Sequence, residues 1–76
     1  MNNKEIAIRE NSKFLLHTTG PSKKINEMNA NELKLLSIKA SAMKIFSENF
    51  DYRDGLEYWG TVEKVSQERL KQIETK

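Results

Sequence analysis

The 76-residue chain has no cysteine, one histidine, one proline and three glycines. The missing cysteine excludes disulfides, and a structural zinc site would have no thiolate and no histidine besides His17. A domain of this length buries only about 60 to 65% of the surface that its unfolded chain exposes, so its core is small. We therefore expect its stability to come from helix packing and from association with partners.

Long apolar stretches are also missing from the sequence. No run approaches the roughly 20 residues that a membrane-spanning helix requires. The first residues, MNNKE, lack the basic start and the apolar stretch of a secretory signal. These absences predict a soluble, cytoplasmic protein that makes no membrane contact.

The sequence does contain two amphipathic helical patterns, Asn31 to Phe50 and Asp54 to Thr75, separated by Asp51-Tyr52-Arg53. Because so short a connection folds two apolar faces onto each other, the sequence predicts an antiparallel helical hairpin. The predicted fold class is all-α (mainly α), with one small helical domain over residues 1–76. A short N-terminal helix or β-hairpin is expected to pack on the two long helices.

The first long helix is expected to begin near Asn29 or Asn31. Asn29 stands three residues before Glu32, as in a capping box, where each side chain accepts a hydrogen bond from the other residue's backbone N–H. At about 100° per residue, the helix has a broad apolar arc and a second apolar side. The arc contains Leu33, Leu35, Leu36, Ala40, Met43, Phe46 and Phe50, and the second side contains Ile38, Ala42 and Ile45. So wide a surface predicts more than one neighbour, either the N-terminal segment or another copy of the protein.

The second long helix is expected to begin at Asp54, a favourable N-cap residue before Gly55. Folding the chain back about residue 53 places two residues opposite each other when their numbers sum to about 106. This register pairs Phe46 with Trp59 or Gly60, Met43 with Val62, Ala40 with Ser66, Leu36 with Leu70, and Leu33 with Ile73. The small side chains of Ala40 and Ser66 predict a close approach of the two backbones.

The segment from Glu5 to Thr18 has two interpretations. As a pair of strands, it places Ile6 and Ile8 on one face and Phe14 and Leu16 on another. As a helix, it scatters the same apolar residues around the axis. An isolated hairpin is marginal in water, which favours the helix slightly.

A connector follows this segment. Gly20-Pro21 interrupts any regular structure, since proline disfavours a helical conformation at the residue before it. Ile25 and Met28 are expected to anchor the connector on the helices. Residues 1–28 are thus the N-terminal segment and linker, and residues 29–76 are the hairpin.

The charge of the chain is unevenly distributed. The segment from residue 13 to residue 44 contains six lysines and only two glutamates, which gives it a local net charge of +4. This basic region makes a nucleic-acid-binding accessory protein the alternative function, with phosphate contacts from Lys13, Lys23, Lys24, Lys34, Lys39 and Lys44. Lysine outnumbers arginine ten to three, which disfavours direct reading of base sequence.

No catalytic, cofactor-binding or metal-binding motif stands out. His17 has no companion nucleophile or carboxylate at a recognisable spacing. The acids Glu48, Asp51, Asp54 and Glu57 do not match a calcium loop, and residues 20–24 lack the glycine spacing of a phosphate loop. We therefore expect a protein that is not an enzyme and that holds no cofactor or metal.

Aromatic side chains gather around the predicted turn, next to Arg53. Aromatic residues and arginine are enriched at binding hot spots, where one anchor contributes about 2 kcal/mol or more. Phe50 and Trp59 are expected in the core. The partner-binding candidates are Tyr52, Arg53 and Tyr58 at the turn, with Ile38 and Ile45 on the second apolar side of the first long helix.

These features predict a non-enzymatic protein–protein interaction module that acts as a regulator or inhibitor by occupying a partner's surface. The second apolar side of the first long helix favours self-association as well, so a homo-oligomer is a further expectation. The composition, rich in lysine, asparagine and isoleucine, is typical of AT-rich microbial, plasmid or phage genomes. An inhibitor encoded by a phage is one subtype of this prediction.

Overall fold

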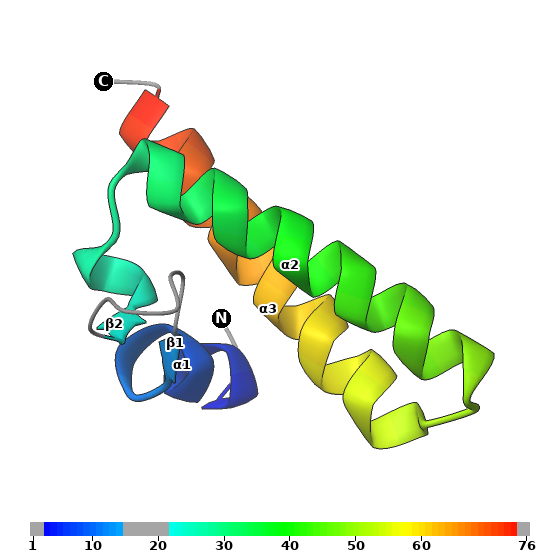
Figure 1. Cartoon of the computed structure of the whole chain (residues 1–76). Helices are drawn as coiled ribbons and strands as arrows, with labels where there is room; N and C mark the ends of the chain where they lie inside the picture. The colour runs from blue at the N-terminus through cyan, green and yellow to red at the C-terminus, as the bar shows by residue number, and fades with distance from the viewer. Residues whose placement is uncertain (1–2, 15–21, 75–76) are drawn as a thin grey trace.

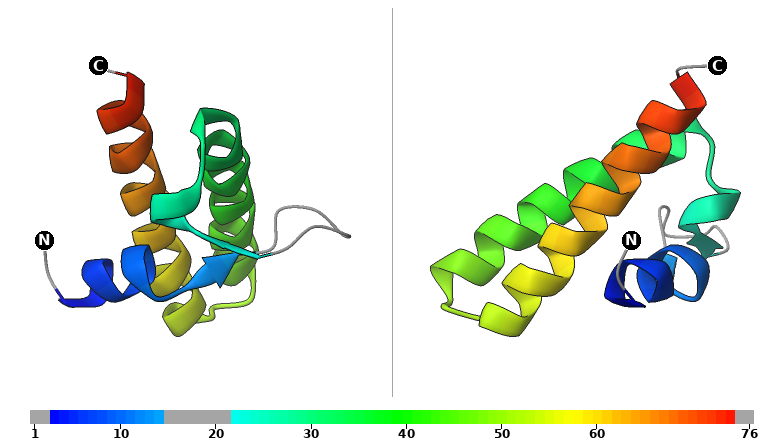
Figure 2. Two further views of the ribbon diagram at one scale, coloured as in Figure 1. Left: turned by 90° about the vertical axis from the view of Figure 1, so that its left-hand side faces the viewer. Right: turned by 180° about the vertical axis from the view of Figure 1, so that it is seen from behind.

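Two long helices, α2 (Ala30–Asn49) and α3 (Arg53–Glu74), lie side by side in opposite directions and form the body of the fold (Figure 1). The computed structural model describes residues 3–14 and 22–74. The turn between α2 and α3 lies at one end, and the start of α2 meets the end of α3 at the other (Figures 1 and 2). The predicted mainly α fold with an antiparallel helical hairpin is confirmed.

The start of α2 is fixed by the predicted capping box. The backbone N–H of Glu32 donates to Asn29 Oδ1, and the backbone N–H of Asn29 donates to Glu32 Oε1, both at 2.9 Å. These two bonds satisfy backbone donors that have no partner within the helix.

In the described part of the chain, no helix is both long enough and apolar enough to cross a membrane.

The turn between the helices is a Schellman motif. Asp51 adopts a left-handed conformation with φ of 53°, its N–H donates to the Glu48 carbonyl at 3.1 Å, and the Tyr52 N–H donates to the Ser47 carbonyl at 2.8 Å. These bonds satisfy the last carbonyls of α2 and reverse the chain within three residues. The prediction that Asp54 caps α3 was wrong: the helix begins at Arg53, and Tyr52, two residues before Asp54, holds the cap position. Because the Tyr52 carbonyl already accepts from the Leu56 N–H, Asp54 lies inside the first turn.

The N-terminal segment contains both predicted kinds of structure, but at different residues. Residues Asn3–Glu10 form helix α1, so the strand interpretation of Ile6 and Ile8 was wrong. A helix forms here because Glu5 and Ile8, about one turn apart, then lie on one face, and both are buried. A short antiparallel pair does form between β1 (Lys13–Phe14) and β2 (Lys23–Lys24). Leu16 lies outside the described residues.

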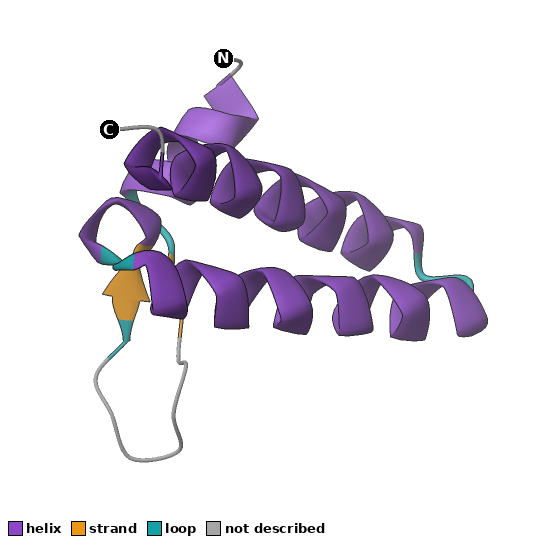
Figure 3. Ribbon diagram, turned by 90° about the horizontal axis from the view of Figure 1, so that it is seen from above, coloured by secondary structure: helices purple, strands orange, loops and turns teal. Residues whose placement is uncertain are grey.

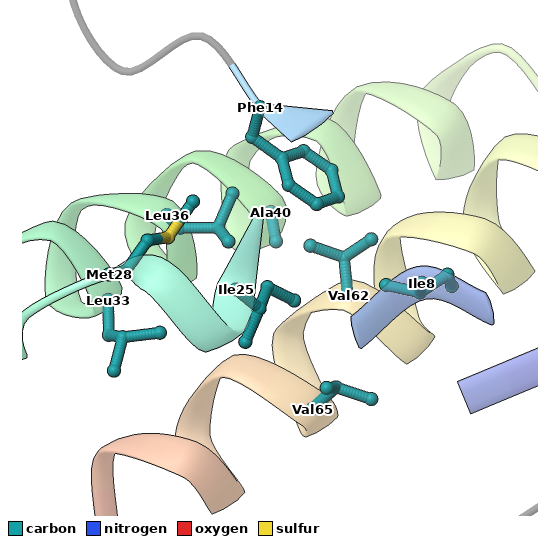
Figure 4. Close-up of a cluster of buried hydrophobic side chains, with 9 residues drawn as sticks. All are labelled: Ile8, Phe14, Ile25, Met28, Leu33, Leu36, Ala40, Val62 and Val65. Carbon is teal, nitrogen blue, oxygen red and sulfur yellow. The ribbon is translucent and has the colours of Figure 1, made fainter. Parts of the chain in front are cut away.

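A single core joins the N-terminal segment to the hairpin. The 3-10 helix η1 (Ile25–Glu27) and Met28 follow β2, and the predicted anchors Ile25 and Met28 are both buried. The core side chains come from α1, the strand pair, η1 and both long helices (Figure 4). They are Ile8, Phe14, Ile25, Met28, Leu33, Leu36, Ala40, Val62 and Val65.

The predicted register of the hairpin agrees with its cross-helix contacts. Glu63 on α3 lies opposite Ser41 and Lys44 on α2, and the Gln67 side chain donates to Ser37 Oγ at 3.2 Å. These contacts lie within two residues of the expected register. Small side chains line the contact between the helices, since Ala40, Ser47, Gly55 and Ser66 are all buried. We call these four residues the small-residue seam.

Three residues assigned to the apolar arc of α2 point outward instead. Leu35, Phe46 and Phe50 are exposed, and the prediction that Phe50 belongs to the core was wrong. At the turn, Ser47 and Gly55 are buried, and a Cβ added at Gly55 would already lie 2.7 Å from Ser47 Oγ, so a phenylalanine ring does not fit there. Trp59 does pack on the core, where its ring lies 6.4 Å from that of Phe14.

Two glycines of α3 offer a matched test of the small-residue seam. A Cβ added at Gly55 would lie 2.7 Å from both Ser47 Oγ and Tyr52 Cε1, whereas at Gly60 the nearest atom is Lys44 Cδ at 3.9 Å. Both changes to alanine gain helix propensity of about 1 kcal/mol, but overpacking costs about 1 to 3 kcal/mol.

We expect Gly60→Ala to raise the free energy of unfolding and Gly55→Ala to lower it, as measured by urea denaturation of both variants and the parent chain. Equal stabilisation by the two substitutions would contradict the close approach of α2 and α3 at Gly55.

Candidate protein-binding surface

The outer side of α2 is apolar and uncovered by the rest of the described chain. Ile38 and Ile45 are 67% and 58% exposed, and Leu35 and Ala42 lie beside them in solvent. Seen along the view of Figure 3, α3 and α1 lie on the same side of α2. Among the described residues of the N-terminal segment, α1 and η1 contact α3, and this second apolar side stays exposed. We call Leu35, Ile38, Ala42 and Ile45 the α2 stripe.

A second exposed group lies at the turn. The rings of Phe46 and Phe50, one helical turn apart on α2, have centroids 4.7 Å from each other. Phe50 is 69% exposed, Tyr52 is 59% exposed, and Arg53 is also exposed. We call Phe46, Phe50, Tyr52 and Arg53 the turn-end surface. It joins large apolar rings to a cation, the composition that binding hot spots favour.

An open pocket of about 510 Å³ lies beside the turn-end surface, between the start of α3 and α1. Tyr52 lines it together with Tyr58 and Trp59, whose rings meet edge to face at 5.1 Å. Lys4 reaches over it from α1 to form an ion pair with Glu57. Tyr58 is half-buried, unlike the two other predicted turn residues, Tyr52 and Arg53, which are exposed.

Sequence reasoning placed some of these residues and missed others. The candidates Tyr52, Arg53, Ile38 and Ile45 are exposed, as a partner-binding role requires. Phe46, Phe50 and Leu35 were assigned to the buried arc and are surface residues. The spacing of the apolar residues from 35 to 45, alternately three and four apart, is the signal that marks Leu35 as part of a separate stripe.

Two charged side chains of α3 form contacts with the neighbouring helices α2 and α1. Hydrogen bonds from Ser41 and then from the Lys44 ammonium, 3.1 Å away, hold the pKa of Glu63 below its ordinary value of 4.5. On the other side of α3, the buried carboxylate of Glu5 lies 2.7 Å from the Lys64 ammonium and raises the pKa of Lys64. Glu63 thus links α3 to α2, and Lys64 links α3 to α1.

The lysines of the basic region do not form one cationic surface. Three of them face carboxylates: Lys23 lies 2.7 Å from Glu32, Lys34 lies 3.6 Å from Glu74, and Lys44 lies 3.1 Å from Glu63. Lys13 and Lys24 are register partners in the strand pair, and Lys39 is exposed on α2. Pairing with carboxylates lowers the charge available to phosphates.

The geometry gives no support to a metal-binding or catalytic site among the described residues considered in the sequence. In residues 3–14 and 22–74, no group of three or more histidine, aspartate or glutamate side chains is placed to hold a metal ion. His17 lies outside the described residues.

The lowered pKa of Glu63 gives a test of the hairpin's polar contacts. Its ionised form is favoured in the folded state, so its contribution to stability is full above pH 4.5 and is lost as the pH falls through the folded-state pKa. We expect Glu63→Gln to lower the free energy of unfolding at pH 7 by about 1 kcal/mol.

The difference between Glu63→Gln and the parent chain should shrink as the pH falls below 4.5. Urea denaturation at pH 7 and pH 3 measures it, with Glu10→Gln on the exposed end of α1 as the control. A difference that stays constant with pH would show that the ionised form of Glu63 is not what stabilises the hairpin.

No protein-family model matches this chain, and neither a curated protein nor a solved structure matches it. The functional conclusion therefore depends on the chain's own surfaces. Within residues 3–14 and 22–74, the exposed large hydrophobic side chains lie in the turn-end surface and the α2 stripe.

Proposed function

We propose that this protein is a non-enzymatic protein–protein interaction module that regulates or inhibits a partner by occupying part of its surface. The observation that carries the proposal is the turn-end surface. Three of the chain's six aromatic side chains, Phe46, Phe50 and Tyr52, lie mainly in solvent. Burying these side chains in the small core would increase the free energy of unfolding, because it would remove apolar surface from water. Their exposure is accounted for if a partner covers them.

The shape of the turn-end surface suits a protein partner better than a small molecule. The adjacent pocket is open, whereas small-molecule sites enclose most of their ligand's surface. Phe46 and Phe50 project from the last two turns of α2, where a groove on a partner can take both rings. Arg53 adds a donor for a carboxylate or a carbonyl at the rim.

Nucleic-acid binding remains the alternative, with less support. Lys23, Lys34 and Lys44 are already opposite carboxylates. Phosphate binding weakens steeply between low and moderate salt, whereas an apolar protein interface does not. Binding of DNA or RNA that falls steeply over that range, together with failure to capture a protein, would favour this alternative.

The proposal is tested by affinity capture with the tagged full chain and variants of the turn-end surface. We expect one captured protein to be lost with Phe50→Ser and with Tyr52→Ser, because truncating a hot-spot anchor weakens affinity by about thirtyfold or more. Glu68→Ala, an exposed change on α3, is the matched control and should retain the partner.

Circular dichroism of each variant separates loss of binding from loss of fold. Capture of the same protein by all three variants with equal yield would place its binding site elsewhere and contradict the role of the turn-end surface.

A further inference from the structure

The outward side of α2 carries a regular pattern that the turn-end surface does not use. Six exposed residues stand at alternating intervals of four and three. This is the spacing of the a and d positions in a coiled coil, and here it spans nearly the whole helix. The residues are Asn31, Leu35, Ile38, Ala42, Ile45 and Asn49, which are the α2 stripe and an asparagine at each end.

We propose that the α2 stripe is the interface of a homodimer in which the α2 helices of two copies lie antiparallel, related by a two-fold axis near residue 40. The inference goes beyond the proposed function, because Phe50, Tyr52 and Arg53 of the turn-end surface lie past the end of the paired layers, and Phe46 lies on the flank of the stripe, next to Ile45. A dimer would present two turn-end surfaces at opposite ends of the α2 pair.

The order of residues in the stripe permits this orientation, as it permits a parallel one. In an antiparallel pair, each a position faces a d position of the other helix. Centred on residue 40, this places Leu35 against Ile45 of the second copy, and Ile38 against Ala42. The asparagines then face each other, with Asn31 against Asn49. Every layer joins residues of one kind, because the stripe reads Asn-Leu-Ile in one direction and Asn-Ile-Ala in the other.

Side-chain size supports the same pairing. In the antiparallel register the large Ile38 meets the small Ala42 of the second copy, so the central layers fill without overpacking. A parallel pair would instead place Ala42 against Ala42, leaving a gap between layers of isoleucine. The sizes of the stripe residues therefore favour the antiparallel pair.

Charges beside the stripe discriminate the two orientations. An antiparallel pair brings Lys34 next to Glu48 of the second copy, and the two-fold axis repeats this favourable contact. Both side chains are exposed on the flank of the stripe, and Lys34 also lies 3.6 Å from Glu74 of its own chain, so Glu48 of the second copy would share Lys34 with Glu74. A parallel pair would instead place Lys34 next to Lys39 of the second copy, twice. In the antiparallel arrangement the Lys39 side chains of the two copies meet at the axis, which is one unfavourable contact. The two Lys34–Glu48 contacts are favourable.

The surroundings of α2 make a second copy the fitting occupant. A helix that is apolar on opposite sides is typical of a helix buried on both. The stripe lies in solvent in the described part of the chain, where Ile38 and Ile45 are 67% and 58% exposed. A two-fold interface needs a surface that is complementary to itself, and the stripe has that property in apolarity, size and charge.

The first experiment measures the solution mass of the full chain by sedimentation over a range of concentrations. We expect a reversible transition from 8.8 kDa to twice that mass. Ile38→Glu should raise the dimer dissociation constant about a hundredfold or more, because it places a charge in the apolar layer. Glu68→Ala on α3 is the control and should leave it unchanged.

Charge reversal tests the orientation. Lys34→Glu alone and Glu48→Lys alone should each raise the dissociation constant about three- to tenfold, because each turns two attractive contacts into repulsive ones. The double variant Lys34→Glu/Glu48→Lys should return it to the parent value. A tighter dimer with Lys34→Glu would contradict the antiparallel pair, since that change relieves the Lys34–Lys39 contact of the parallel one.

Because the native chain has no cysteine, disulfide trapping gives an independent measurement. Asn31 and Asn49 are 18 positions apart on α2, about 27 Å along one helix, so they cannot cross-link within one chain. We expect a mixture of Asn31→Cys and Asn49→Cys chains to form a disulfide-linked heterodimer on mild oxidation, and neither variant alone to cross-link efficiently. Efficient cross-linking of each variant with itself, or a monomer at every concentration, would overturn the proposal.

Discussion

The close contact between α2 and α3 along the small-residue seam determines the rest of the structure. Ala40, Ser47, Gly55 and Ser66 let the two backbones approach, and larger apolar residues gather at the opposite end of the hairpin around Leu33 and Leu36. Dispersion and burial favour such close packing. One consequence is that bulky side chains near the turn have no place between the helices. Phe46 and Phe50 lie on the surface for this reason.

The N-terminal segment completes the core rather than adding a separate layer. Ile8, Phe14 and Ile25 bring apolar side chains to Val62 and Val65 of α3 (Figure 4). The pair Glu5–Lys64 closes the edge of this contact with charges. The described residues of this segment pack on the face of the hairpin that includes Val62 and Val65, and the α2 stripe stays exposed; the proposed dimer depends on that asymmetry.

Features that depend on local chemistry could be predicted from the sequence. The capping box of Asn29 and Glu32 is formed by neighbouring residues, and the short connection between two amphipathic patterns leaves few ways to pair them. The register followed from folding the chain back about residue 53, and the match of the small Ala40 with the small Ser66 supported it. The positions that depend on how α2 is rotated about its axis could not be predicted, because a helix with apolar residues on several sides has no unique inward face. Phe50 was misassigned for that reason.

The Schellman turn has a further consequence for recognition. The Tyr52 ring lies close to Gly55, and the Tyr52 backbone N–H donates a hydrogen bond to the Ser47 carbonyl. The turn itself therefore holds this exposed aromatic side chain in place. A side chain that is already ordered loses little conformational freedom when a partner covers it. The chain reversal thereby preorganises an anchor, and a 76-residue protein with a small core obtains a rigid contact point without adding any residues to its interior.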